Sequence, residues 1–143
     1  AAGMMDTFAC NLELKAHLAM GNLVGATTLL TEMMRGGGLP PPDSISFNTV
    51  LAALAEARLP EKAEKTLSLI SDAGLGDLID SHSYTCVILS YAKSSRPDKA
   101  AYWLKRMIEA RVRPDAVTFN TVIAAHAHNG DIDGAKRVLR AFE

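Results

Sequence analysis

Residues 117–123 read Val117-Thr118-Phe119-Asn120-Thr121-Val122-Ile123, and this short segment returns at regular intervals along the chain. Each copy has an alanine 15 residues after its Asn or Thr. The four pairs are Asn11 and Ala26, Asn48 and Ala63, Thr85 and Ala100, and Asn120 and Ala135. Neighbouring copies lie 37, 37 and 35 residues apart. A fixed period of this length is typical of a solenoid of stacked helical units.

Each unit has the pattern of two amphipathic helices. Apolar residues of the second unit recur at the spacing of one helix face, namely Phe47, Val50, Leu51, Leu54 and Ala55. A second helix follows, and Pro60 and Pro97 are placed where its first turn needs no N–H. Its apolar stripe in the third unit is Ala100, Trp103, Leu104, Met107 and Ile108. One hairpin cannot bury both of its faces, so the sequence predicts an all-α solenoid of stacked antiparallel helix hairpins.

Composition and charge fit one soluble domain of 143 residues with a formal charge of −1. The uncharged stretch 116–130 is short and carries polar side chains, so no membrane span is predicted. Residues 1–4 carry no basic cluster, and no targeting segment is visible. Cys10 and Cys86 have no CxxC partner, and we expect both to pack as small hydrophobic residues. Leu139 and Phe142 should stay partly uncovered unless further chain or a partner packs on them.

No catalytic or metal-binding pattern recurs with the period of the units. The four histidines are His17, His82, His126 and His128. The last two are two positions apart, so a helix would point them to different sides. No Ser-His-Asp or Cys-His set is placed to converge. The sequence therefore predicts no enzyme, no cofactor, no metal site and no small-molecule substrate.

Two helix-hairpin families have a period near this one. Tetratricopeptide repeats need a small residue 12 positions before the alanine, whereas this chain has Leu14, Leu51, Ile88 and Ile123 there. The segments around Asn48 and Asn120, together with Arg113-Pro114-Asp115 and Asn129-Gly130-Asp131, instead closely resemble the pentatricopeptide repeat family. The resemblance divides the single solenoid, residues 1–143, into repeats 7–43, 44–80 and 81–115 and a partial repeat 116–143.

This resemblance implies an RNA-binding protein of mitochondria or chloroplasts that binds single-stranded RNA on a concave face, one base to each repeat. In the family, a polar residue of the first helix acts with the last residue of the repeat. The corresponding residues here are Asn11 with Asp43, Asn48 with Asp80, Thr85 with Asp115, and Asn120 without a partner. Family members with Asn and Asp favour uracil, and those with Thr and Asp favour guanine. The implied target is 5′-U-U-G-3′.

Other roles for the same residues stay open. The positions that would flank each base are Phe8, Ile45, His82 and Val117, and each could stack on a base. An apolar residue at a helix start also serves as a staple onto the preceding turn. The Asn and Thr side chains could make helix-cap or intra-turn hydrogen bonds, and Asp43 and Asp115 could be N-caps.

Charge favours a second class of function. Affinity for RNA comes mainly from phosphate neutralisation, yet the expected basic residues of the groove are only Lys15 and Lys93. Repeat 44–80 has three basic against six acidic residues, and repeat 81–115 has seven against three. A basic cluster falls on or after the second helix of the third repeat: Lys99, Lys105, Arg106, Arg111 and Arg113. The alternative is a non-catalytic structural or assembly subunit that binds protein in a large organellar complex.

Overall fold

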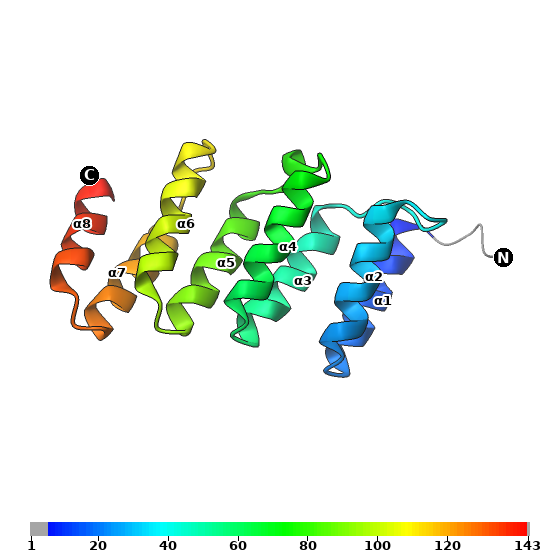
Figure 1. The fold of residues 1–143 in the computed structure, drawn as a ribbon, viewed down its shortest axis with the longest axis horizontal. Helices are drawn as coiled ribbons and strands as arrows, with labels where there is room; N and C mark the ends of the chain where they lie inside the picture. The colour runs from blue at the N-terminus through cyan, green and yellow to red at the C-terminus, as the bar shows by residue number, and fades with distance from the viewer. Residues whose placement is uncertain (1–5, 143) are drawn as a thin grey trace.

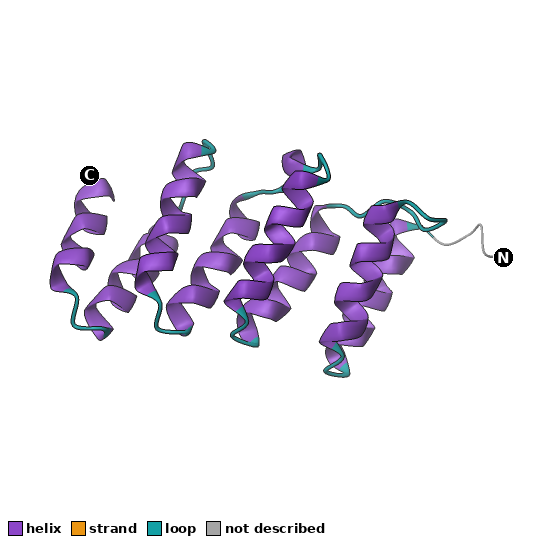
Figure 2. Ribbon diagram, viewed as in Figure 1, coloured by secondary structure: helices purple, strands orange, loops and turns teal. Residues whose placement is uncertain are grey.

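The computed structural model describes residues 6–142, and all regular structure in that range is helical (Figure 2). The elements are α1 (Thr7–Ala19), α2 (Leu23–Arg35), α3 (Ser44–Glu56), α4 (Pro60–Asp72), the short 3₁₀ helix η2 (Gly76–Leu78), α5 (Ser81–Lys93), α6 (Pro97–Glu109), α7 (Ala116–His128) and α8 (Ile132–Phe142). The predicted all-α class is confirmed.

The helices form an elongated stack of two layers, with α1 and α8 at opposite ends (Figure 1). The first helices of the units, α1, α3, α5 and α7, pack against one another in a row, which we call the first-helix layer. The second helices, α2, α4, α6 and α8, form the second-helix layer. Each of α2, α4 and α6 also packs on the first helix of the following unit. The units are therefore in phase, and equivalent residues fall on a common face.

The core lies between the two layers. The predicted stripe of α3, from Phe47 to Ala55, is buried throughout. The predicted stripe of α6 is buried with one exception, because Ile108 is 44% exposed. Including Ile108 in the core was wrong: its side chain lines a cavity of about 540 Å³ between α6 and α8. Cys10 and Cys86 are both buried and free, as expected.

Polar caps and turns determine where the helices begin. Aspartates precede all four first helices, and each accepts a hydrogen bond from the backbone N–H three residues on: Asp6, Asp43, Asp80 and Asp115. Pro60 and Pro97 are the first residues of α4 and α6, as predicted. The predicted N-cap role of Asp43 and Asp115 is therefore confirmed.

The turn inside each hairpin uses the same left-handed backbone position in every unit. The four equivalent residues, at the same 37, 37 and 35 residue steps, are Gly21, Arg58, Ser95 and Gly130. Their φ angles lie between 57° and 76°. Glycine adopts this conformation without steric cost, whereas Arg58 and Ser95 do not.

At the end of the stack, Leu139 on α8 is 50% exposed, and the side chain of Phe142 lies outside the described residues. None of the helices in residues 6–142 has the length and apolar character needed to cross a bilayer.

Candidate nucleic-acid interface

The predicted base-contacting residues of the first repeat lie together at the start of α3. Asn11 on α1 donates from Nδ2 to Asp43 Oδ1 at 3.1 Å. The hydroxyl of Ser46 donates to Asn11 Oδ1. Asn11 is only 6% exposed. Its amide is therefore enclosed and engaged at both ends.

The second repeat has the same arrangement in a more open form. Asn48 Nδ2 lies 3.3 Å from both Asp80 Oδ1 and Asp80 Oδ2. The hydroxyl of Ser83 donates to Asn48 Oδ1 at 2.7 Å. Asn48 is half-buried and Asp80 is exposed. This pair is therefore accessible from the face of the first-helix layer.

The third repeat links its two residues through an intermediate. Thr85 Oγ1 lies 3.3 Å from Thr118 Oγ1, and Thr118 Oγ1 donates to Asp115 Oδ1 at 2.8 Å. Asn120, at the equivalent position of α7, is exposed. The bonds of Asn48 and Thr85 join neighbouring units, so the intra-turn alternative for these two residues is wrong.

Hydrogen bonds stabilise the ionised form of the pairing aspartates. Burial raises the pKa of Asp43, but donors outweigh it, namely the backbone N–H of Ser46, the amide of Asn11 and the Ser46 hydroxyl, and its pKa is lowered. Asp80 follows the same pattern with Ser83 and Asn48, and its pKa is also lowered. The backbone N–H and hydroxyl of Thr118 lower the pKa of Asp115. All three carboxylates are acceptors at neutral pH.

The predicted flanking residues each occupy the second position of a first helix. Phe8, Ile45 and Val117 are 71%, 55% and 64% exposed, and His82 is exposed as well. A staple onto the preceding turn would bury these side chains, so the exposure favours a surface role. Three apolar side chains and one imidazole thus recur beside the polar pairs, once in each unit.

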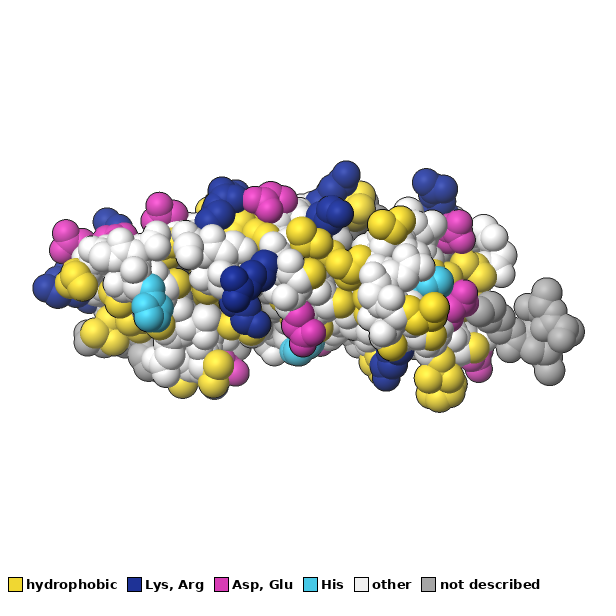
Figure 3. Space-filling model, turned by 90° about the horizontal axis from the view of Figure 1, so that it is seen from below, with side chains coloured by type: hydrophobic (Ala, Val, Ile, Leu, Met, Phe, Trp, Pro, Cys, Tyr) yellow, Lys and Arg dark blue, Asp and Glu magenta, His cyan; other side chains and the backbone are white. Residues whose placement is uncertain are grey.

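The first-helix layer carries little charge. Among its four helices, α7 has no Lys, Arg, Asp or Glu, and α3 has only Glu56. Lys15 and Lys93 are exposed, as a groove role requires. Figure 3 shows charged side chains of both signs interspersed along the upper edge of that view. Long-range attraction of a polyanion by the first-helix layer is therefore weak.

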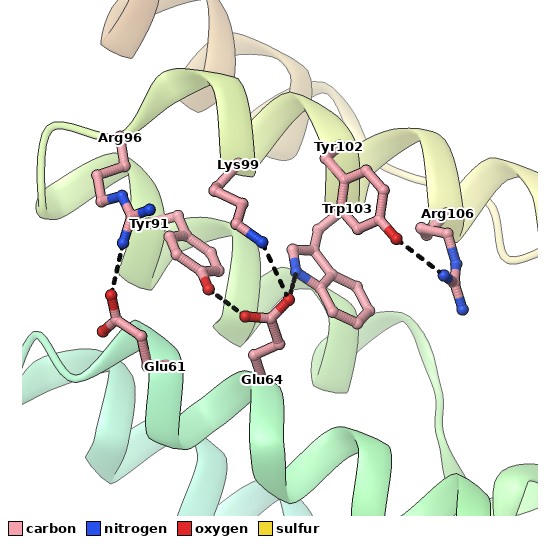
Figure 4. A network of polar contacts seen from close by, with 8 residues as sticks. All are labelled: Glu61, Glu64, Tyr91, Arg96, Lys99, Tyr102, Trp103 and Arg106. Atoms are coloured by element: carbon pink, nitrogen blue, oxygen red, sulfur yellow. Dashed lines mark hydrogen bonds and ion pairs between the residues drawn. The ribbon is translucent and has the colours of Figure 1, made fainter.

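Part of the predicted basic cluster is engaged within the protein (Figure 4). Lys99 lies 3.5 Å from Glu64 and over the rings of Tyr91 and Tyr102. Arg106 donates to the Tyr102 hydroxyl at 3.0 Å. Lys105, Arg111 and Arg113 are exposed. Only these last three keep the character of an open basic surface.

Sequence reasoning missed the centre of that network. Glu64 on α4 accepts from the Tyr91 hydroxyl and, at 3.1 Å, from Trp103 Nε1 (Figure 4). Its three partners come from α5 and α6, so Glu64 joins the second and third units. No local signal marks Glu64, because its partners lie 27 to 39 residues away.

Comparisons with known proteins agree with this architecture. A model of the PPR repeat family matches residues 79–128, and a PPR repeat model matches residues 45–75 and 117–142. A pentatricopeptide repeat-containing protein of Arabidopsis thaliana is 27% identical over 89% of this chain and 22% of that protein. The small ribosomal subunit protein mL103 (rPPR7) of the same plant is 24% identical over 96% of this chain and 32% of that protein.

Solved structures show the same fold. The pentatricopeptide repeat protein PPR10 from maize has a TM-score of 0.82 at 18% identity, over 95% of this chain and 19% of PPR10. PPR10 in complex with an 18-nt psaJ RNA element has a TM-score of 0.79 at 18% identity, over 96% of this chain and 20% of PPR10. This chain spans about a third or less of the length of these relatives. Further relatives are named as mitochondrial in Xenopus tropicalis and chloroplastic in A. thaliana.

Proposed function

Since the chain belongs to the pentatricopeptide repeat family, we propose that it binds single-stranded RNA along its first-helix layer, without catalysis, in a mitochondrion or chloroplast. The observation that carries the proposal is the recurrence of one composite surface in successive units. A first-helix amide or hydroxyl faces the capping aspartate of the next unit, and an exposed apolar or imidazole side chain stands beside it.

The second unit is the best formed of these surfaces. Asn48 has donors and an acceptor for the edge of a base, and Asp80 remains an exposed acceptor. Ile45 and His82, at the starts of α3 and α5, would flank that base on its two faces. The first unit is less suited to base contact because Asn11 is buried, whereas Asn48, whose amide makes equivalent bonds, is only half-buried.

Electrostatics indicates modest affinity. The first-helix layer has Lys15 and Lys93 as its exposed basic residues, and the whole chain has a charge of −1. Each neutralised phosphate contributes a counterion-release term, so few contacts predict both weak binding and a shallow dependence on salt. Stacking and hydrogen bonding to two or three bases would then contribute most of the affinity.

A matched pair of truncations tests this proposal. Ile45→Ala on α3 and Leu69→Ala on α4 remove similar, partly exposed aliphatic side chains from the two layers, at 55% and 44% exposure. We expect Ile45→Ala to weaken binding of a fluorescent single-stranded RNA that contains UUG by about tenfold, and Leu69→Ala to leave it unchanged. Equal affinity of both variants and the parent chain would refute base contact at this face.

A second candidate function is a protein-binding subunit of a large assembly. The observation that favours it is the relative named as a small ribosomal subunit protein. Lys105, Arg111 and Arg113 would form the docking surface in this case. Reversing all three charges to Glu should then release the chain from its assembly, while RNA binding by the isolated chain stays unchanged. If the charge-reversed variant stayed in the assembly after nuclease treatment, docking through these three residues would be contradicted.

A further inference from the structure

Three potential metal ligands from different helices meet where the third unit packs on the fourth. They are Asp98 on α6, His126 on α7 and Asp131 just before α8, and one ligand atom from each lies within 4.8 Å of the others. His126 Nδ1 is 3.1 Å from Asp131 Oδ2. The sequence analysis did not connect them, because the metal pattern it looked for was a recurring one.

The equivalent positions of the preceding joint have a different chemistry. One repeat earlier, Asp98, His126 and Asp131 correspond to Glu61, Tyr91 and Arg96. Arg96 Nη1 there lies 2.5 Å from Glu61 Oε1, and the guanidinium lies over the Tyr91 ring (Figure 4). In the last joint the cation is replaced by Asp131. Two carboxylates therefore face each other where the preceding joint has an ion pair, and like charges at this separation repel.

The histidine between these carboxylates has a free nitrogen. His126 is 2% exposed, and its Nε2 is buried with no hydrogen-bond partner in the part of the chain that the structure describes. Buried polar atoms of proteins normally have a partner, and an orphan one points to a water or an ion. Imidazole nitrogens are common metal ligands, and a neighbouring carboxylate is their usual companion in such sites.

The backbone leaves room for this group. Gly134 donates its N–H to Asp131 Oδ1 at 2.9 Å, which leaves Oδ2 on the side of His126. A Cβ at position 134 would come within 2.4 Å of His126 Nδ1 and 2.3 Å of Asp131 Oδ2. Asp98 is exposed, so an ion can reach the cluster from solvent. Asp98 and His126 also line the cavity between α6 and α8.

We propose that Asp98 and the free Nε2 of His126 bind a divalent transition-metal ion of the zinc class, which joins α6 to α7, while Asp131 holds the imidazole through Nδ1. Ligand bonds of about 2.0–2.2 Å in a tetrahedral site place neighbouring ligand atoms roughly 3.4 Å apart. Asp98 and His126 offer ligand atoms within 4.8 Å of each other, and the exposed Asp98 side chain has the freedom to close the remainder. Water fills the remaining positions of the tetrahedron.

Other charged groups around the cluster moderate its charge without removing the case for a cation. Arg137 on α8 and Lys105 and Glu109 on α6 line the same cavity. Among the effects that lower the pKa of Asp131, the Gly134 N–H comes first, and His126 and Arg137 contribute as well. A single guanidinium balances only one of two carboxylates.

The test uses the chain after chelator treatment, titrated with Zn²⁺ in a calorimeter and with Co²⁺ in a visible spectrometer. We expect one bound ion per chain, intense Co²⁺ bands typical of tetrahedral coordination, and a melting temperature that rises with Zn²⁺. Asp98→Asn should weaken Zn²⁺ binding at least tenfold and remove the rise in melting temperature. Asp98 is exposed, so this variant keeps the fold.

Two controls make the result decisive. Glu61→Gln changes the equivalent residue of the preceding joint and should bind Zn²⁺ like the parent chain. In the first unit, His17 Nδ1 lies 3.1 Å from the Asn22 amide, which is the contact equivalent to that of His126 with Asp131. This pair has no carboxylate, so Asn22→Ala should also leave Zn²⁺ binding unchanged. Equal Zn²⁺ affinity of the parent and Asp98→Asn, or no binding to either, overturns the proposal. None of these readouts depends on RNA.

Discussion

Asn48 on α3 and Asp80 before α5 are 32 residues apart in sequence, and the amide nitrogen of Asn48 lies 3.3 Å from both oxygens of the Asp80 carboxylate. The same aspartate caps α5 by accepting from the backbone N–H of Ser83 at 3.0 Å. One carboxylate therefore starts a helix, joins two units and presents an acceptor at the surface. The proposed RNA site and the stacking of the solenoid share this residue.

The first two units should respond differently to loss of their asparagines. Asn11→Ala removes an enclosed amide together with its contacts to Asp43 and to the Ser46 hydroxyl, so we expect a cost of about 1–3 kcal/mol in the free energy of unfolding. Asn48→Ala acts at a half-buried site that water can reach, and we expect less than about 1 kcal/mol. Urea denaturation of both variants measures the difference. A larger cost at Asn48 would contradict the assignment of Asn11 to structure.

Glu64 should be important to the joint between the second and third units. Glu64→Ala leaves the Tyr91 hydroxyl, Trp103 Nε1 and the Lys99 ammonium without their acceptor, and we expect a loss of about 2–3 kcal/mol in the free energy of unfolding. The matched control is Glu61→Ala, which breaks the exposed ion pair with Arg96 and should cost about 0–1 kcal/mol. Chemical denaturation followed by Trp103 fluorescence checks both. Similar costs for the two variants would show that the network adds nothing beyond a surface ion pair.

The sequence predicts the part of this molecule that repeats. Phe47, Leu51 and Leu54 recur at helical spacing, and the buried face of α3 follows from that spacing alone. The pairing of Asn48 with Asp80 came from family resemblance, and the geometry agrees with it. The resemblance assigns both residues to the repeat 44–80, and in the structure its last residue, Asp80, also caps the first helix of the next unit.

What the sequence did not predict is specific to single joints. Glu64 looks like an ordinary charged residue of a second helix, and only its packing against Tyr91 and Trp103 reveals its role. The repeat pattern likewise does not predict that Asp98 lies close to His126 and Asp131, because the preceding joint has Glu61 and Arg96 at the positions of the two aspartates. Contacts that depend on differences between repeats become apparent only in the three-dimensional structure.

The turn inside the hairpins offers a stabilising change. Ser95 holds φ at 58°, where Gly21 and Gly130 occupy the equivalent positions. A residue with a side chain is destabilised by roughly 1–2 kcal/mol in the left-handed region. Glycine avoids this cost, but it also increases the conformational entropy of the unfolded chain, which cancels part of the gain. We expect Ser95→Gly to stabilise the protein by about 0.5–1 kcal/mol. Gly130→Ala is the reverse experiment and should destabilise it.

Thermal unfolding of these two variants beside the parent chain decides the point. Opposite shifts of the melting temperature are expected. A lower melting temperature for Ser95→Gly would mean that the serine makes a contact that outweighs its backbone strain.

Acid should loosen the stack through the capping aspartates. The pKa values of Asp43 and Asp80 are lowered in the folded chain, so the unfolded state binds more protons once the pH nears their ordinary value of about 3.9. The stability that these groups contribute is complete at neutral pH and is lost as the pH falls from about 4 through the folded pKa values. Urea midpoints measured between pH 7 and pH 3 report this loss. In Asp80→Asn, the urea midpoint should fall less steeply between pH 4 and pH 3 than in the parent chain. An equally steep fall in both proteins would show that Asp80 does not cause the loss of stability in acid.

The most direct measurement of the central claim is a change of base preference at the third unit. Family members with Thr and Asp favour guanine and those with Asn and Asp favour uracil, so Thr85→Asn should move the preference of that position from guanine to uracil. The parent chain and the variant are each titrated with two short single-stranded RNAs that contain UUG or UUU. We expect the parent to favour UUG and Thr85→Asn to favour UUU, while the folded content of both proteins stays the same. An identical ratio of the two affinities in both proteins would contradict base contact by the first-helix layer.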